Sequence, residues 1–271
     1  MPDGPLDSDL RATATGEAQP PYVGLAAGHG VVVVVPTYNE QENLLPIAAA
    51  ILEALPQAIL LLVDDNSPDG TGALADALAS REPRLHVLHR PAKQGLGVAY
   101  RDGFRWALDR PETRALVQMD ADFSHDPRDL PRLLAPLMSG SDLVLGTRYM
   151  RGGGTVGWPT QRKLISRAGT SFARAMLLLP YRDLTGGFKA WRREMLEAIR
   201  LRESNASGYG FQIETTWWAH RRHAVVTQVP IVFRERVAGR SKMSGGIVGE
   251  ALRLVVRLRL EAIREALRST R

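Results

Sequence analysis

The sequence predicts an α/β fold built around a mostly parallel sheet. Three observations carry this prediction: a five-valine run at Val31–Val35 that Pro36 stops, an apolar run at Ala58–Val63 that two aspartates stop, and helical spacing over Asn43–Leu55 between them. Short, nearly uninterrupted apolar runs are typical of strands that are buried on both faces of a parallel sheet. The three segments therefore predict a β-α-β unit.

The alternation of helix and strand continues through the middle of the chain. We expect, in order, helix Thr71–Ser80, strand Leu85–His89, helix Gly97–Leu108, strand Ala115–Met119, helix Leu130–Met138, strand Asp142–Gly146 and helix Gln161–Leu179. The pattern then becomes indistinct until a strand at Val225–Phe233. A last helix, Gly245–Arg268, carries most of its charges on one face.

Composition limits the function classes. The 271-residue chain has 35 Lys and Arg against 29 Asp and Glu, a formal charge of +6 and a pI near 10.0, which indicates an anionic partner: a nucleotide, a nucleic acid or a phospholipid surface. It has no cysteine, which excludes disulfides, zinc-thiolate sites and a catalytic thiol, and fits a reducing cytosol.

Length and patterning predict three parts. Residues 1–28, rich in Pro, Gly, Ala, Asp and Thr, are expected to form a flexible leader, residues 29–244 a single catalytic domain, and residues 245–271 a basic amphipathic helix. No run approaches the roughly 18 apolar residues of a spanning helix, and the N-terminus lacks a signal-peptide pattern. We therefore expect a peripheral protein on the cytoplasmic side of a membrane, without signal peptide or transmembrane helix.

The C-terminal segment from Glu250 to Arg271 has six arginines and three glutamates, a net charge of +3. Such a helix suits the surface of an anionic membrane. The alternative is a helix that packs on the domain or on a partner protein.

A strand that ends in two aspartates, Asp120 and Asp122, predicts a divalent-metal site. Two carboxylates at a strand end repel each other and are costly to bury, and a metal ion removes both problems. Oxygen ligands favour Mg²⁺ or Mn²⁺, and nucleotides and phosphates bind at the C-terminal strand ends of α/β domains. By itself, however, an Asp-x-Asp triplet is more often a surface turn or a helix cap than a metal site.

Two further polar loops open at the same edge of the predicted sheet. PTYNE, with Pro36, Tyr38 and Glu40, follows the first strand, and DDNSPDG follows the second. Tyr38 can pack on a base, and Asp65 or Glu40 can accept hydrogen bonds from a base or ribose. In the second loop Asp69 and Gly70 are better explained as turn residues.

Basic residues follow the later strands. Arg148 in GTRY lies at the same edge as the aspartates, and Arg162 and Ser166 come shortly after it. A basic cluster beside an acidic site suits a phosphate, with a structural ion pair as the alternative for Arg148. The segment Arg234–Lys242 predicts a cationic loop that can close over a diphosphate, with a solvated basic loop as its alternative.

Four other features remain open or are explained by structure. In Lys93–Tyr100 two glycines occur without the third of a dinucleotide fingerprint, so we expect them to let a helix approach the sheet. Asp183 in DLTGGF suits a substrate role or a turn equally well, and Glu214 suits a buried, paired helix acid. His125 is interpreted as a structural neighbour of the aspartates.

Together, PTYNE, DDNSPDG, DAD, GTRY, DLTGGF and RVAGRSK resemble the polyprenol-phosphate (dolichol-phosphate) mannosyltransferases of glycosyltransferase family 2. The resemblance runs from about Val31 to Ser244. It implies the GT-A fold, which is Rossmann-like with a mixed, mostly parallel sheet flanked by helices. It also implies an inverting transfer of mannose from GDP-mannose to a polyprenyl monophosphate, with a divalent metal as cofactor.

The resemblance assigns roles to individual positions. It implies contacts to the guanosine from Pro36, Tyr38, Glu40, Val63 and Asp65, and contacts to the ribose, diphosphate and metal from Asp120, Ala121 and Asp122. Arg148 would meet the donor and acceptor phosphates, with Arg162 and Ser166 at the acceptor phosphate and Arg236 and Lys242 in the closing loop.

Some relatives carry transmembrane helices after the catalytic domain, whereas this chain ends in one amphipathic helix, so a separate membrane anchor protein is a possible partner. Two rivals remain at this point. One is a UDP-sugar-dependent glucosyl or aminosugar transferase of the same fold, and the other is a non-catalytic module that binds membrane surfaces. Nucleic acid is not expected as a partner, because the basic residues are spread over the chain without a stacking motif.

Overall fold

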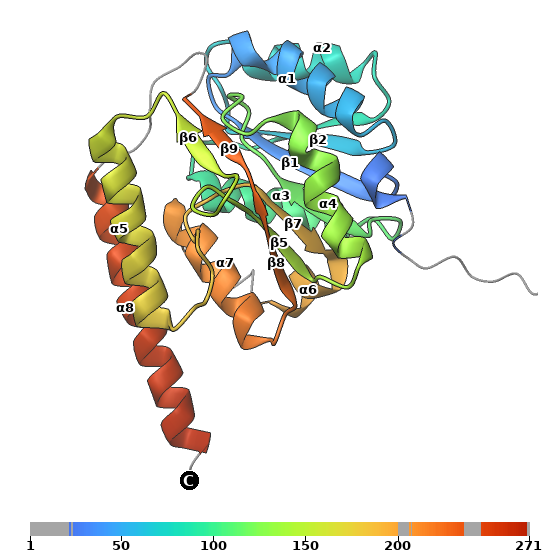
Figure 1. Ribbon diagram of the computed structural model, residues 1–271. Helices are drawn as coiled ribbons and strands as arrows, with labels where there is room; N and C mark the ends of the chain where they lie inside the picture. The colour runs from blue at the N-terminus through green and yellow to red at the C-terminus, as the bar shows by residue number, and fades with distance from the viewer. Residues whose placement is uncertain (1–21, 23, 200–205, 207, 236–244, 270–271) are drawn as a thin grey trace, which may run out of the picture.

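The computed structural model of the chain describes residues 22, 24–199, 206, 208–235 and 245–269. Its centre is a seven-stranded sheet with the order β3-β2-β1-β4-β7-β5-β8 (Figure 1). These strands are β1 (Val31–Thr37), β2 (Ile59–Asp64), β3 (Leu85–His89), β4 (Ala115–Gln118), β5 (Leu143–Thr147), β7 (Lys189–Arg192) and β8 (Val226–Pro230). Only β7 runs antiparallel to its neighbours, β4 and β5. The predicted mixed, mostly parallel sheet is confirmed.

The valine run of β1 is continuous because both faces of the sheet are covered. Val32 and Val34 belong to one hydrophobic cluster, and Val31, Val33 and Val35 belong to the other. The strand does not stop at Pro36 as expected but continues to Thr37. Strand β4 pairs with β1 only as far as Val34, so the proline lies beyond that ladder, where a missing N–H is tolerated.

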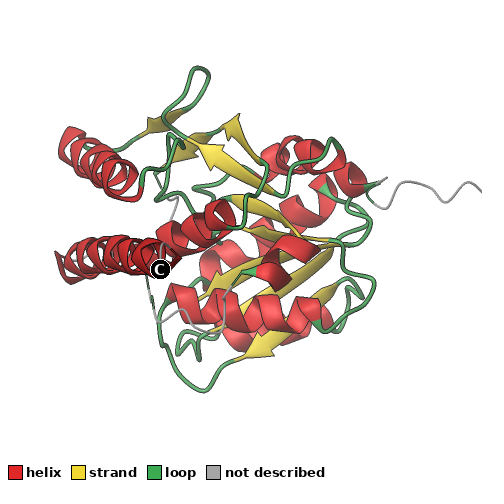
Figure 2. Ribbon diagram, turned by 90° about the horizontal axis from the view of Figure 1, so that it is seen from below, coloured by secondary structure: helices red, strands yellow, loops and turns green. Residues whose placement is uncertain are grey.

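Helices cover both faces of the sheet in a three-layer arrangement (Figure 2). Apolar residues of α1 (Gln41–Ala54), α2 (Thr71–Ala79) and α4 (Leu130–Met138) pack on one face. The other face is covered by α3 (Leu96–Leu108) and α7 (Tyr209–Arg221), with contributions from α5 (Thr160–Leu177), α6 (Arg193–Ala198) and α8 (Gly245–Ser269). Short 3-10 turns, η1 (Leu25–Ala27) and η2 (Pro127–Asp129), complete the fold.

The expected strand Val225–Phe233 is wrong as a single element. The structure divides it into β8, in the main sheet, and β9 (Val232–Arg234), which pairs with β6 (Gly154–Val156) in a small parallel sheet. Ile231 lies between them and is bonded to both sheets: its N–H donates to the Thr147 carbonyl, and its carbonyl accepts from the Gly154 N–H. The chain therefore changes sheets at this residue.

The glycines of Lys93–Tyr100, at the start of α3, also differ from expectation. A Cβ at Gly97 would lie 2.2 Å from the Ala206 carbonyl oxygen, so this glycine permits an approach to the segment before α7, not to the sheet. The close approach of α3 to the sheet occurs six residues later, at Gly103, where a Cβ would lie 2.5 Å from Val34 Cγ1.

Packing begins within the segment expected to be a leader. Leu25 is fully buried in the cluster that contains α4, and the Tyr22 hydroxyl donates to Glu194 Oε2 at 2.8 Å. These contacts join the start of the described chain to the sheet, before residue 29.

Helix α8 packs against α5 and α7 and continues past them (Figures 1 and 2). Leu254, Val255 and Leu258 are buried in this contact. A second apolar row on the same helix is exposed: Leu252, Val256, Leu260, Ile263 and Leu267. Within the part of the chain that the structure describes, no helix has the length and apolarity needed to cross a membrane.

Candidate active site

The loops that carry the predicted site residues meet where the strand order reverses. From β1 the chain proceeds outward to β2 and β3, and it then returns to β4 on the other side of β1. The C-terminal ends of β1 and β4 therefore border a crevice, which is the usual ligand site of an open α/β sheet. Tyr38 and Glu40 follow β1, and Asp120 and Asp122 follow β4.

The Asp-Ala-Asp loop is held in a tight turn. Asp122 is buried, and its Oδ1 accepts the Ser124 backbone N–H at 3.1 Å. Phe123 has a positive φ of 59°, an uncommon backbone conformation for a bulky residue. Asp120 is partly exposed and receives a longer contact, 3.4 Å, from the Tyr100 hydroxyl to its Oδ1. The turn thus brings both carboxylates to the strand end.

His125 holds the backbone of this loop through a hydrogen bond. Its Nδ1 accepts the Asp120 backbone N–H at 3.2 Å, so the ring proton resides on Nε2, which has no hydrogen-bond partner among the described residues. The ring is fully buried between Phe188, stacked at 4.8 Å, and Phe233, edge-on at 5.2 Å. Burial lowers the pKa of His125, which keeps the ring neutral at pH 7. The structure therefore places His125 as a support for Asp120.

Besides His125 Nε2, two buried polar atoms near the aspartates have no hydrogen-bond partner among the described residues. They are Ser124 Oγ, in the same loop, and Gln212 Nε2, on α7. A Cβ at Gly187 would lie 3.5 Å from Gln212 Nε2 and 3.6 Å from Asp120 Oδ1, so the glycine leaves space between them. Orphaned polar atoms beside a pair of carboxylates are what an absent polar ligand would leave. The described residues contain no group of three or more His, Asp or Glu side chains that could hold a metal.

Asp65 lies in a buried ion pair at the end of β2. Its Oδ1 accepts from Arg90 Nη1, and Arg90 also donates to Asp102 Oδ2 and Gln94 Oε1, each at 2.9 Å. Burial raises the pKa of Asp65 by more than the Arg90 charge lowers it. Arg90 was not predicted as a site residue. It directly follows β3, so the strand-end rule that identified Asp65 would have found it.

Other residues of the PTYNE and DDNSPDG loops, which follow β1 and β2, have local partners. The Lys93 ammonium lies 3.9 Å from the ring centroid of Tyr38, and Glu40 Oε2 accepts from Asn43 Nδ2 at 2.9 Å. The turn interpretation of the second loop holds: Gly70 has φ +92°, and Asp69 Oδ1 accepts from the Thr71 N–H at 3.0 Å.

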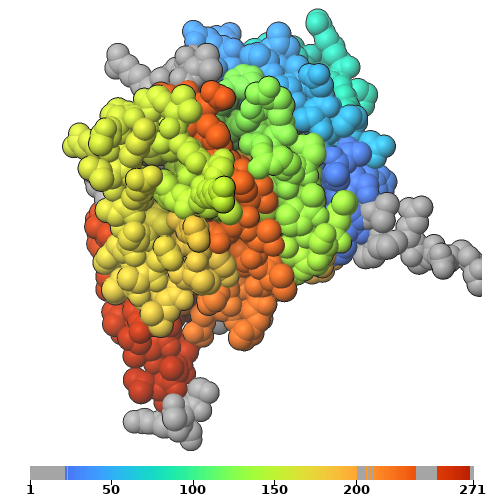
Figure 3. Space-filling model, viewed as in Figure 1, coloured from blue at the N-terminus to red at the C-terminus, as the bar shows by residue number. Residues whose placement is uncertain are grey.

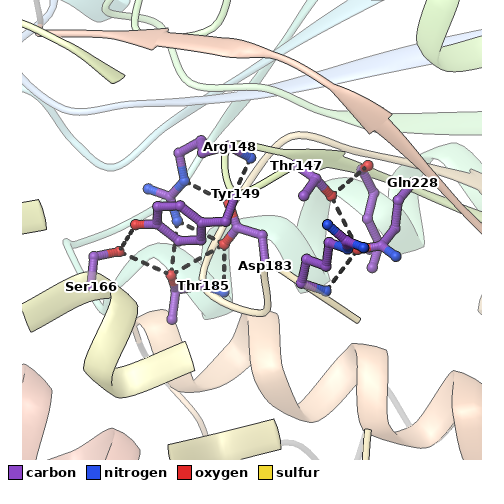
Figure 4. A network of polar contacts seen from close by, with 9 residues as sticks. Thr147, Arg148, Tyr149, Ser166, Asp183, Thr185 and Gln228 are labelled. Carbon is purple, nitrogen blue, oxygen red and sulfur yellow. Dashed lines mark hydrogen bonds and ion pairs between the residues drawn. The ribbon is translucent and has the colours of Figure 1, made fainter. Parts of the chain in front are cut away.

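Arg148, directly after β5, forms a buried bidentate pair with Asp183 (Figure 4). Arg148 Nε donates to Oδ2 at 2.7 Å and Nη2 donates to Oδ1 at 2.8 Å, while the backbone N–H of Arg148 donates to Oδ2 at 3.1 Å. Burial raises the pKa of Asp183, but the Arg148 charge and these hydrogen bonds outweigh it, and the net pKa is lowered. The ion-pair alternative for Arg148 is thus present in the structure, and its anion-binding role stays a prediction.

The three residues expected at an acceptor phosphate converge. Ser166 Oγ accepts from the Tyr149 hydroxyl at 2.7 Å and lies 3.5 Å from Thr185 Oγ1, which itself accepts from Arg148 Nη2 at 2.8 Å (Figure 4). Arg162 joins through Trp158, whose ring centroid lies 4.1 Å from the Arg162 guanidinium carbon and 5.3 Å from that of Arg148.

Arg162 is also held by Glu235, whose Oε1 and Oε2 accept from Nη1 at 2.7 and 2.9 Å. No local pattern in the sequence identifies Trp158 and Glu235. Each follows a strand of the small β6–β9 sheet, which forms only because the chain leaves the main sheet at Ile231. The backbone N–H of Arg234 donates to the Ser124 carbonyl, so the chain leaves β9 beside the Asp-Ala-Asp loop. Arg236 and Lys242 lie outside the described residues.

Comparisons with known proteins agree with this arrangement. Residues 32–200 match the model of glycosyl transferase family 2. This chain belongs to glycosyl transferase family 2. An undecaprenyl-phosphate mannosyltransferase of Micrococcus luteus is 49% identical over 88% of this chain and 98% of its own length. A polyprenol monophosphomannose synthase of Mycolicibacterium smegmatis is 48% identical over 82% of this chain and 83% of its own length.

A solved structure shares the fold of this family 2 chain. Glucosyl-3-phosphoglycerate synthase of Mycobacterium tuberculosis, crystallised with Mn²⁺, UDP and glucosyl-3-phosphoglycerate, superposes with a TM-score of 0.64 at 21% identity, over 87% of this chain and 82% of that one. At this identity the likeness establishes the architecture and leaves the donor and acceptor to other arguments.

Proposed function

We propose that this glycosyltransferase moves mannose from GDP-mannose to a polyprenyl monophosphate, with inversion at the anomeric carbon. The observation that carries the proposal is the placement of two aspartates at the strand-order reversal, facing an arginine-rich network. Relatives that cover most of this chain are named as undecaprenyl-phosphate mannosyltransferase and polyprenol monophosphomannose synthase, which supports both the sugar and the lipid acceptor.

The donor side of the crevice would bind the nucleotide. Tyr38 offers a ring for the base, with Pro36 and Val63 beside it. Asp65 receives one hydrogen bond from Arg90 among the described residues, which leaves acceptor capacity for a base N–H or a ribose hydroxyl. Glu40 would complete this set, and the loop of Asp120, Ala121 and Asp122 would meet the ribose and diphosphate.

The carboxylates of Asp120 and Asp122 fit a Mg²⁺ or Mn²⁺ ion. Two protein oxygens are enough for such an ion, which commonly takes its remaining ligands from phosphates and water. The orphaned Ser124 Oγ in the same loop is a third oxygen that this site can offer. When bound, the ion would supply positive charge against the diphosphate.

The acceptor side would align a phosphate for attack. A phosphate monoester has a second pKa near 6, so it is largely ionised at neutral pH and no strong general base is required. The task of the protein is then to hold two anions together, which Arg148, Arg162 and Ser166 would do for the acceptor. Arg236 and Lys242, in the predicted closing loop, would offset charge on the leaving diphosphate.

The exposed row of α8 would bring this site to its lipid substrate. Burial of the row in the interface of an anionic membrane is favourable, and arginines of the same helix would meet the head groups. Helix α8 packs on α5 and α7, and Ser166 of the acceptor network lies on α5, so docking of α8 would bring the network close to the membrane. A separate anchor protein would reinforce this contact.

A donor-and-acceptor transfer assay tests the proposal. Purified protein is given radiolabelled GDP-mannose or UDP-glucose with a polyprenyl phosphate and Mg²⁺ or Mn²⁺, and label in the lipid fraction is counted. We expect transfer from GDP-mannose only. Transfer from UDP-glucose alone would replace the donor assignment, and no transfer from either donor, despite GDP binding by calorimetry, would contradict the acceptor assignment.

A further inference from the structure

We propose that a second phosphate-binding site lies on α5, beside the acceptor network but separate from it, and that it takes the phosphate of an anionic phospholipid head group. A groove of about 430 Å³ lies along this helix. Its lining, termed the arginine groove, consists of Tyr149, Arg167, Thr170, Ser171, Arg174 and Arg182. Helix α5 lies at the molecular surface (Figure 3, yellow).

Charge is the first reason. The arginine groove contains three arginines and no acidic residue. Among the described residues none of the three forms an ion pair with a carboxylate, in contrast to Arg148 and Arg162 in the crevice. Three unpaired guanidinium groups around one groove repel each other, and an anion between them would relieve that repulsion with fork-shaped hydrogen bonds.

Buried polarity is the second, independent reason. Thr170 is only 2% exposed, lines the arginine groove, and its Oγ1 has no hydrogen-bond partner among the described residues. A hydroxyl in the middle of a helix normally donates to a backbone carbonyl or points to water. An orphaned hydroxyl on a residue that lines the same groove as three arginines is what a site for an anion with several oxygen atoms would contain.

The surroundings of the groove favour a lipid over a free anion. Leu164 and Ile165 on α5 and Leu178 at its end are 62%, 41% and 67% exposed, and the exposed row of α8 lies on the adjoining helix. Helix α5 itself carries four basic residues and no acidic one. Arginines beside exposed aliphatic side chains match the boundary between head groups and acyl chains.

Tyr149 separates the two phosphate sites. Its ring centroid lies 5.1 Å from the guanidinium carbon of Arg148 and 5.4 Å from that of Arg167, so one ring faces an arginine of each site. Its hydroxyl belongs to the acceptor network through Ser166. A phospholipid in the arginine groove would therefore lie next to the polyprenyl phosphate and would orient the crevice on the membrane.

Vesicle co-sedimentation of the full chain tests the site. Vesicles of phosphatidylcholine alone are compared with vesicles that also contain phosphatidylglycerol, at low and high salt. We expect Arg174→Gln and Arg182→Gln each to weaken partitioning to the anionic vesicles about fivefold, and the double variant roughly 25-fold. The charge-matched control Arg81→Gln, an exposed arginine after α2, should change it less than about twofold.

Two further variants separate a built site from a diffuse positive field. Arg174→Lys keeps the positive charge but cannot donate the paired hydrogen bonds of a guanidinium group, so this variant should bind the anionic vesicles more weakly than the wild type. Thr170→Val removes the orphaned hydroxyl without changing charge, and it should also weaken partitioning. Circular dichroism melting checks that each variant is folded.

The source of the phosphate is distinguished by calorimetry with inorganic phosphate. Weak binding of inorganic phosphate beside tight vesicle binding, both reduced in Arg174→Gln, would support the head-group assignment. Binding of inorganic phosphate as tight as vesicle binding would overturn it in favour of a soluble anion. Equal losses in Arg174→Gln and Arg81→Gln would overturn the site altogether. None of these measurements depends on sugar transfer, so they stand apart from the proposed function.

Discussion

Two buried ion pairs lie beyond the C-terminal ends of the sheet strands, Asp65 with Arg90 after β2 and β3 and Arg148 with Asp183 after β5, and they behave differently. On the donor side Arg90 divides its guanidinium among Asp65, Asp102 and Gln94, so Asp65 receives one of its hydrogen bonds. On the proposed acceptor side, Arg148 by itself donates three hydrogen bonds to Asp183. Burial raises the pKa of Asp65, whereas the pairing outweighs burial and lowers the pKa of Asp183.

The difference shows that burial of an ion pair does not by itself define its role. Asp183 has its acceptor positions filled and serves to hold Arg148 in place. Asp65 is less completely satisfied and retains acceptor capacity for a ligand. The Asp65 pair is thus able to receive further hydrogen bonds, whereas the Asp183 pair holds an arginine that is already oriented.

The largest effect should come from a carboxylate outside both pairs. Asp122→Ala should lower transfer by at least about 1,000-fold, since the site would lose a metal ligand and charge stabilisation of the transition state. The unfolding midpoint should stay near that of the wild type. The exposed Asp109→Ala serves as a control with ordinary activity. Wild-type-like turnover of GDP-mannose by Asp122→Ala would contradict the metal assignment.

Asp183→Asn should destabilise the protein by about 3 kcal/mol, because it leaves the Arg148 charge buried without its carboxylate. Urea unfolding at pH 7 measures the loss. The double variant Arg148→Gln/Asp183→Asn removes the orphaned charge and should regain much of the stability. If the single variant were as stable as the wild type, Asp183 would not be the anchor described above.

Lys189 offers a third buried charge, with neutral partners. Its Nζ donates to the Gln212 carbonyl at 2.6 Å and to Thr216 Oγ1 at 2.9 Å, and burial lowers its pKa to about 7, opposed by the Asp183 charge. As the pH rises above 7, the folded chain releases a proton that the unfolded chain still holds, so stability should rise with a slope that approaches about 1.4 kcal/mol per pH unit toward pH 9.

Urea unfolding at pH 7, 8 and 9 would measure this slope for the wild type and for Lys189→Met. The variant lacks the titrating group and should lose this component. An unchanged slope in Lys189→Met would show that another group is responsible for the pH dependence.

Asp65→Asn should cost little stability, because Arg90 keeps Asp102 and because the fold does not favour the charged form of Asp65. Its main effect should be on ligand binding: GDP affinity by calorimetry should fall about tenfold, the size of one charge-assisted hydrogen bond. A stability loss equal to that of Asp183→Asn would remove the contrast between the two pairs.

The smallest effect is expected for Glu235→Gln. Glu235 also pairs with an acceptor-side arginine, but its side chain is 37% exposed, so water can replace it at Arg162. The stability loss should stay below about 1 kcal/mol in urea unfolding. A larger loss would mean that the Arg162 pair behaves like the buried Arg148 pair.

More of the N-terminal half of the sheet than of the C-terminal half could be predicted from the sequence, for a physical reason. Strands β1 and β2 are continuous apolar runs, and polar loops follow them, so these strands and the shared edge of their loops followed from pattern alone. Strand β7, Lys189–Arg192, contains a lysine and an arginine, and no apolar run marks it. Helix α7 is buried on all sides and has no amphipathic period to detect.

The site followed the same division. Asp65, Asp120, Asp122 and Arg148 were predicted as site residues because each lies just after an expected strand. The partners of the arginines were harder to predict, since Glu235 reaches Arg162 only after the chain has changed sheets, and Asp183 lies in a loop whose pattern suited a turn as well as a ligand. Contacts between distant segments leave no local pattern.

The position of β7 also has a consequence for how the chain folds. Strands β1 to β4 come from one continuous stretch, residues 31–118, whereas β5 and β8 reach them only through β7, which is synthesised after α5. Local pairings form early, and distant ones wait for the chain between them. We expect a nascent chain to complete the half that contains β1 to β4 first, and the half that contains β5 and β8 only after β7 has been synthesised.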